Sequence, residues 1–118
     1  MEKNRGIKRL FYALIYSWYG FYSALKNEAA FRQEFVLFLL LTPISFFFDV
    51  TPLERFLMIS SLVLVMIVEV LNSAIETVVD RVSMDKHKLS GRAKDYGSFA
   101  VLMSLGIAAG CWLTILLS

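Results

Sequence analysis

The chain has 118 residues, which allows one domain at most. It is 58% hydrophobic and only 19% charged, which is too apolar for an ordinary soluble domain of this length and favours a membrane protein. The formal net charge of +2 is small, and the single cysteine, Cys111, excludes a disulfide framework and a cysteine-based metal site.

The first predicted element is an amphipathic helix over residues 1–26. Its apolar residues recur at i, i+3, i+4 and i+7 spacing from Ile7 to Leu25, and basic residues cluster near its start. This pattern predicts a helix that lies in the membrane surface with its aromatic side chains at headgroup depth. Alternatively, the apolar stripe packs on the protein's own spanning helices, and both arrangements can hold together.

Three spanning helices are predicted to follow, at about residues 29–49, 54–80 and 91–117. The last of them contains an uncharged run, residues 96–118, which can cross a hydrocarbon core of about 30 Å at about 1.5 Å per residue. The middle one is apolar apart from Glu69 and Glu76. The first has a shorter uncharged run and contains Pro43, which a spanning helix tolerates.

The positions of lysine and arginine predict the topology. Basic residues precede the first span and fill the loop between the second and third, whereas the 49–55 loop has only Arg55 beside two acids. Because positive charge marks cytoplasmic segments, the N-terminus and the second loop are expected in the cytoplasm. Gly106 and Gly110 form a GxxxG pattern in the third span, which suits close packing within the bundle or between copies.

A polar stripe interrupts the second span. Its members follow i, i+3, i+4, i+7 and i+11 spacing, so they share one helix face: Glu69, Asn72, Ser73, Glu76 and Asp80. Acids inside a membrane are costly and usually face a bundle interior or a wet cavity, which makes the stripe a candidate functional site. A solvated helix end would explain Asp80 but not Glu69, which has an apolar turn on each side.

Two further polar segments are expected to converge on this stripe. "NEAAFRQE", residues 27–34, begins the first span, and "SGRAKDYGS", residues 90–98, begins the third. Glu28 and Arg32 could instead form an ordinary i, i+4 ion pair, and Lys94 could be only a membrane anchor. Carboxylates without histidine or cysteine partners favour Mg²⁺, and a nearby lysine suits phosphate, so the set points to Mg²⁺-dependent phosphoryl transfer. Glu69, the deepest acid, would be the general base toward an alcohol.

These two segments and "MIVEVLNSAIETVVDR" together resemble the bacterial integral-membrane diacylglycerol kinase family, over essentially the whole chain as one domain, residues 1–118. The resemblance implies an all-α membrane protein with a surface helix and three transmembrane helices per protomer, assembled as a homotrimer. It implies transfer of the ATP γ-phosphate to diacylglycerol, giving phosphatidic acid, at the cytoplasmic face of the bacterial inner membrane. Expected partners are ATP, Mg²⁺ and membrane lipid, with no nucleic acid.

The resemblance also implies roles for individual residues. Glu69 would be the catalytic base, and Glu28 and Glu76 would hold Mg²⁺. Nucleotide contacts would come from the surface helix, the polar stripe and the second loop: Arg9, Tyr16, Glu28, Asn72, Glu76, Asp80, Asp85, Lys86, His87, Lys94 and Asp95. The lipid substrate would lie near Ala30, Glu34, Glu69 and Ser98. Lys86 departs from the aromatic residue that family members often carry before the loop histidine, so the resemblance does not by itself carry the nucleobase contact over to this position.

Three alternatives stay open on the sequence. Undecaprenol, which related proteins phosphorylate, could replace diacylglycerol as the alcohol. A buried glutamate in a short membrane chain also suits a small proton-coupled transporter subunit, but the acids and the basic loop gather at one membrane face. A non-catalytic assembly subunit would use the GxxxG pattern and would leave Glu28, Glu76 and Lys94 unexplained.

Overall fold

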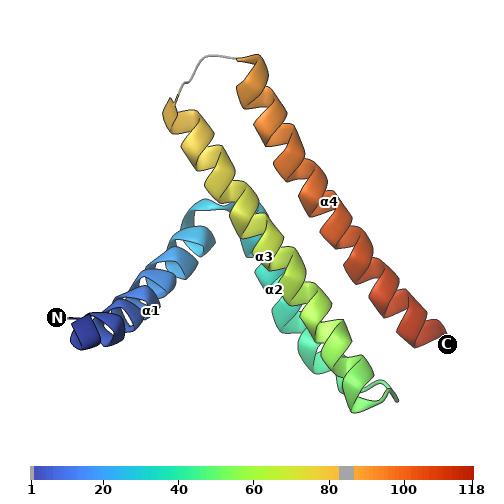
Figure 1. The fold of residues 1–118 in the computed structure, drawn as a ribbon. Helices are drawn as coiled ribbons and strands as arrows, with labels where there is room; N and C mark the ends of the chain where they lie inside the picture. The colour runs from blue at the N-terminus through green and yellow to red at the C-terminus, as the bar shows by residue number, and fades with distance from the viewer. Residues whose placement is uncertain (1, 83–86) are drawn as a thin grey trace.

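The computed structural model describes residues 2–82 and 87–118, which form four helices (Figure 1). They are α1 (Glu2–Asn27), α2 (Ala29–Ser45), α3 (Pro52–Val82) and α4 (Lys88–Leu117). Helices α3 and α4 run side by side and make the most extensive contact, α2 packs on α3, and α1 extends away from the bundle. The prediction of an all-helical chain is confirmed.

Helix α1 packs against α2 near its C-terminal end. Phe21 packs edge-on against Phe31 and Phe35 of α2, with ring centroids 6.3 Å and 5.3 Å apart. The apolar side chains farther toward the N-terminus, such as Ile7, Leu14 and Trp18, are exposed. The stripe predicted from the sequence is therefore mostly unburied by the chain's own helices, and an exposed apolar surface of this kind suits a membrane interface.

The junction between α1 and α2 is a single extended residue, Glu28, with φ −112° and ψ 104°. Arg32, one turn into α2, donates through Nη1 to the carbonyl oxygens of Leu25 at 2.6 Å and Lys26 at 3.2 Å. A cation at a helix C-terminus satisfies carbonyl groups that lack partners and interacts favourably with the helix dipole. Arg32 thus fixes the bend between the two helices. The sequence had suggested an i, i+4 ion pair with Glu28 instead.

Helix α2 ends at Ser45 rather than near residue 49, and a short turn leads to α3. Arg55 stabilises this turn by donating to the carbonyl oxygens of Ser45 at 3.1 Å and Phe48 at 3.0 Å. A reciprocal capping box begins α3: Thr51 N–H donates to Glu54 Oε1 at 2.9 Å, and Glu54 N–H donates to Thr51 Oγ1 at 3.1 Å. These contacts explain why the helix starts at Pro52.

The buried residues of α4 form a narrow seam, whereas α3 packs against both α4 and α2. The buried residues of α3 are Met58, Ser61, Val65, Glu69, Asn72 and Ser73, and those of α4 are Gly97, Ser104 and Ala108. The α4 residues are small and recur at near-heptad spacing, which lets two long helices pack closely along their length. Gly106 and Gly110 lie outside this seam, and each has open space where a β-carbon would be. The GxxxG pattern is therefore not used to pack α4 on α3.

Among residues 2–82 and 87–118, two helices are long and apolar enough to cross a membrane, namely α3 with 31 residues and α4 with 30. Most of their large apolar side chains are exposed rather than buried against another helix. A soluble domain rarely exposes so much apolar surface, and lipid or further protein would cover it in a membrane protein. The third predicted span, α2, has 17 residues and does not by itself reach that length.

Trp112, near the C-terminal end of α4, stabilises the contact between α4 and α3. Its indole N–H donates to the carbonyl oxygen of Met58 at 2.9 Å, across 54 residues of sequence. We expect Trp112→Phe to lower the free energy of unfolding by about 1 kcal/mol or more, because one interhelical hydrogen bond is lost and the phenyl ring fills less space than the indole. Denaturant titration in detergent micelles would measure this, with Trp18→Phe on the exposed face of α1 as the control. Equal midpoints for the two variants would contradict the assignment.

Candidate active site

The polar stripe predicted for the second span lies on one face of α3 and becomes more accessible toward the helix end. Glu69 is 7% exposed and Asn72 is 8% exposed, whereas Glu76 is half-buried and Asp80 is exposed. Burying a carboxyl and an amide so deeply is unfavourable unless they meet other polar groups. A carboxyl on α2 meets Glu69, and a lysine on α4 meets Asp80 at the exposed end of the stripe.

On the α2 side, Glu34 lies next to Glu69, so two carboxyl groups from different helices adjoin in an apolar region. Glu34 is half-buried, and its Oε1 has no hydrogen-bond partner within the described part of the chain. A buried oxygen without a partner calls for an explanation such as a functional role or a bound molecule. The pair brings together the predicted base and one of the residues predicted to face the lipid.

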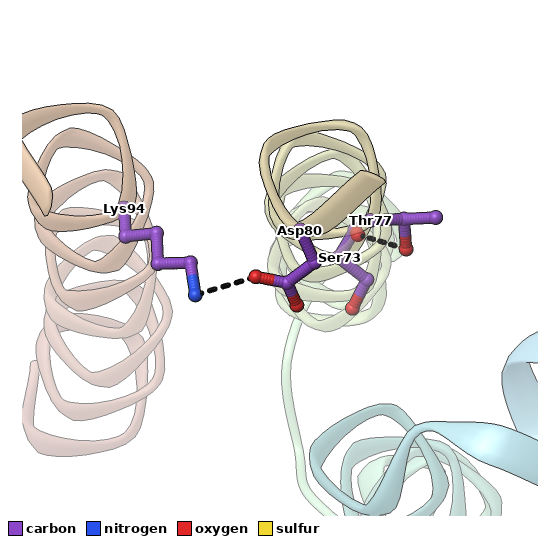
Figure 2. Close-up of polar contacts among 4 residues, drawn as sticks. All are labelled: Ser73, Thr77, Asp80 and Lys94. Carbon is purple, nitrogen blue, oxygen red and sulfur yellow. Dashed lines mark hydrogen bonds and ion pairs between the residues drawn. The ribbon is translucent and has the colours of Figure 1, made fainter. Parts of the chain in front are cut away.

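On the α4 side, Lys94 Nζ lies 2.8 Å from Asp80 Oδ1 (Figure 2). Both side chains are half-exposed, with 42% of Lys94 and 54% of Asp80 accessible, so the pair contributes little to stability. One turn below, Thr77 Oγ1 donates to the Ser73 carbonyl oxygen at 2.8 Å. The ion pair places a lysine, which has three donors, at the open end of the stripe.

Asn72 occupies the middle of the stripe and lies directly against Gly97 of α4. A β-carbon placed on Gly97 would lie 3.0 Å from Asn72 Cγ and would approach Asn72 Oδ1 still more closely. That oxygen is buried and has no hydrogen-bond partner among residues 2–82 and 87–118. Sequence reasoning passed over Gly97, although its position on the small-residue seam with Ser104 and Ala108 was a signal that could have found it.

Several predicted site residues do not lie in this cluster within the single chain. Ala30, Asp95 and Ser98 are exposed, and Arg9 and Tyr16 lie exposed on α1, which diverges from the α3–α4 pair (Figure 1). His87 begins α4 as its N-cap, with its Nδ1 accepting from Leu89 N–H at 3.1 Å. Asp85 and Lys86 lie outside the described residues.

The candidate metal ligands are two carboxylates, Glu28 at the α1–α2 junction and Glu76 on α3. Within the described residues, no group of three or more histidine, cysteine, aspartate or glutamate side chains could hold a metal ion. Mg²⁺ is usually bound by one or two protein carboxylates, with waters and substrate phosphates completing its coordination. Glu28 and Glu76 are each half-buried and each carries the carboxylate oxygens that this mode uses.

An open apolar groove of about 340 Å³ runs beside the inner end of the stripe. Its lining comes from α1, α2 and α3, and includes Phe21, Phe31, Phe35, Met66 and Val70. Met66 and Val70 flank Glu69 in the sequence, so the groove lies close to the buried carboxyl pair. A hydrocarbon chain in this groove would place a polar headgroup near Glu34 and Glu69.

The fold and the site define a helical membrane-type protein with a buried acidic stripe that opens toward a lysine. The profile of the family described as "Prokaryotic diacylglycerol kinase" matches residues 15–116. The chain is 53% identical to a diacylglycerol kinase of Escherichia coli (strain K12) over 99% of this chain and 96% of the relative. It is 50% identical to a diacylglycerol kinase of Haemophilus influenzae over 95% of each chain.

A diacylglycerol kinase of Pseudomonas aeruginosa is also 50% identical, over 95% of this chain and 91% of the relative. The chain belongs to the prokaryotic diacylglycerol kinase family. The resemblance drawn from the sequence is thereby confirmed.

Proposed function

We propose that this protein is an ATP- and Mg²⁺-dependent kinase that transfers the γ-phosphate of ATP to the hydroxyl of diacylglycerol, giving phosphatidic acid. The observation that carries the proposal is its identity of 50–53% with diacylglycerol kinases over nearly the whole chain. The proposal is supported by the adjoining carboxyl groups of Glu34 and Glu69, the lysine at the open end of the stripe and the nearby apolar groove, which would supply the chemistry of this reaction.

In this proposal the reaction proceeds by direct transfer. Glu69 accepts the proton of the lipid hydroxyl, the hydroxyl oxygen forms a bond to the γ-phosphorus, and the bond from that phosphorus to the β–γ bridging oxygen breaks. Glu34 lies next to Glu69 and would orient the headgroup, together with Ala30 and Ser98. The acyl chains would occupy the groove lined by Phe21, Phe31 and Met66.

The nucleotide would bind at the open end of the stripe. Lys94 can keep its contact with Asp80 and donate to the γ-phosphate with its remaining hydrogens. Glu28 and Glu76 would hold Mg²⁺, which neutralises charge on the phosphates when bound. Asn72 and Asp95 would support the phosphates, and Arg9, Tyr16 and the 85–87 loop would contact the rest of the nucleotide.

We further propose that α2 spans the membrane with α3 and α4, in the bacterial inner membrane with the N-terminus in the cytoplasm. The 17 residues of α2 rise about 26 Å, and the turn that follows extends this toward the core thickness of about 30 Å. Side chains such as Val36, Leu37 and Leu40 are exposed on α2 and suit contact with lipid. The basic segments before α2 and at the start of α4 favour this topology.

The proposed assembly is a homotrimer with sites shared between protomers. The Asp80–Lys94 pair is half-exposed in one chain, and α1 diverges from it (Figure 1). A neighbouring protomer could bring α1 or the α2 start against that open end and complete the site. The exposed apolar faces of α3 and α4 provide surface for such contacts.

In the test, purified protein in lipid micelles is incubated with Mg²⁺ and γ-labelled ATP. Diacylglycerol and undecaprenol are supplied in separate reactions. We expect label in phosphatidic acid and its loss when EDTA removes Mg²⁺. Label only in undecaprenyl phosphate would keep the reaction type and overturn the substrate. Absence of label in both lipids, from protein shown to be folded by its helical circular dichroism, would overturn the kinase function.

A further inference from the structure

The contact between Asn72 and Gly97 joins α3 and α4 at the centre of the candidate site. Asn72 lies between Glu69 and Glu76 on α3, and Gly97 lies between Lys94 and Ser98 on α4. Both residues are buried. A close contact of the two helices within the polar region is thus made by an amide and a residue without a side chain.

The space for this contact exists only because residue 97 is glycine. A β-carbon there would be 3.0 Å from Asn72 Cγ and 3.7 Å from Asn72 Cβ. Rotation about the Cβ–Cγ bond would move the carboxamide oxygen away but would leave the Cγ contact unchanged. An alanine therefore requires the whole Asn72 side chain to move, or the two helices to separate.

Within residues 2–82 and 87–118, no hydrogen bond compensates for the burial of the Asn72 carboxamide oxygen. A buried unpaired polar atom is unfavourable for stability. Such a cost is typical of functional sites, where a polar group is kept ready for a ligand. Because Gly97 has no side chain, the Asn72 carboxamide can occupy this position.

We propose that Gly97 is a positioning residue, which fixes the Asn72 carboxamide and the spacing between the acids of α3 and Lys94 of α4. The inference rests on the proposed kinase function. In the proposed reaction Gly97 touches no reacting atom. It acts only through Asn72 and through the spacing between α3 and α4. Since a displacement of about 1 Å can reduce catalysis by about 10²-fold, a single added methyl group is expected to matter.

The first comparison is Gly97→Ala with Gly91→Ala. Both glycines lie within α4, and alanine favours a helix over glycine at each position, but no atom lies within 4 Å of a β-carbon at Gly91. We expect Gly97→Ala to lower kcat by about 10- to 100-fold, and Gly91→Ala to stay within about twofold of the parent protein. Equal activity of the two variants would overturn the proposal.

A double-mutant cycle separates positioning from general loss of packing. Asn72→Ala removes Oδ1 and Cγ, the two atoms nearest to a β-carbon at position 97, and leaves Asn72 Cβ at 3.7 Å, an ordinary contact distance. The substitution is expected to reduce activity by itself. If Gly97 acts through Asn72, the double variant should be no less active than Asn72→Ala, and its unfolding midpoint in denaturant should exceed that of Gly97→Ala. Independent, multiplying losses in activity would overturn the proposal.

The test of Gly97 can be distinguished from the test of the kinase function. The parent protein is assayed first with labelled ATP and diacylglycerol. Absence of label in the parent would count against the kinase function. Label in the parent, together with an unaffected Gly97→Ala variant, would count against the positioning role alone.

Discussion

Glu69→Gln is expected to reduce phosphoryl transfer to diacylglycerol by about 10²- to 10⁴-fold, the range typical for loss of a general base. Glutamine keeps the shape of the buried side chain but cannot accept the hydroxyl proton. Glu69 is 7% exposed and adjoins Glu34, so the substitution also removes one of two neighbouring acids from an apolar region. The folded protein should therefore persist, as judged by size-exclusion chromatography and by the unfolding midpoint.

Two further variants make this experiment specific. Asp49→Asn changes an exposed acid beyond the end of α2 and is expected to leave activity unchanged. Glu34→Gln should raise the apparent KM for the lipid more than it lowers kcat, because Glu34 is assigned to the headgroup. A larger loss of kcat in Glu34→Gln than in Glu69→Gln would transfer the role of base to Glu34. Full activity of both would exclude a base in this pair.

The helices and their polar faces could be predicted from the sequence because both depend on local periodicity. The spacing of Glu69, Asn72, Glu76 and Asp80 places them on one face of any helix, whatever packs against it. Composition likewise indicates membrane-type helices without knowledge of their neighbours. The exposed stripe of α1 follows from the same kind of pattern.

Contacts between helices could not be predicted in this way. The pairing of Asp80 with Lys94 depends on the rotation and register of α4 against α3, which no single-helix pattern specifies. Arg32 has an acid at i−4, so local rules favoured an ion pair, yet its guanidinium binds the carbonyl oxygens at the end of α1. The contact between Asn72 and Gly97 has the same origin, since it depends on how closely the two helices approach.

The end of α2 illustrates a different difficulty. The uncharged run continues to Phe48, but the helix ends at Ser45, where Arg55 from α3 binds the carbonyl oxygens of Ser45 and Phe48. Hydrophobicity predicts which residues avoid water and does not predict where the backbone turns. The turn depends on a hydrogen-bonding partner that lies after it in the sequence.

Glu76→Gln is expected to reduce activity by about 10²-fold or more and to shift the Mg²⁺ dependence to higher concentration. Removing one of two carboxylates weakens the hold on a cation that takes few ligands from the protein. Glu28→Gln should have the same two effects, because Glu28 and Glu76 are proposed to hold one ion. Glutamine at either position keeps a carbonyl oxygen, so raised Mg²⁺ should restore part of the activity.

The measurement is a Mg²⁺ titration of initial rates at fixed ATP for the parent protein, Glu76→Gln, Glu28→Gln and Asp49→Asn. The Mg²⁺ midpoint of Asp49→Asn should match that of the parent protein. If the two glutamates share an ion, the double variant should lose less activity than the product of the two single losses predicts. Reduced activity with an unchanged Mg²⁺ midpoint would assign these glutamates to the nucleotide or to the packing of α2 on α3, and would exclude them as metal ligands.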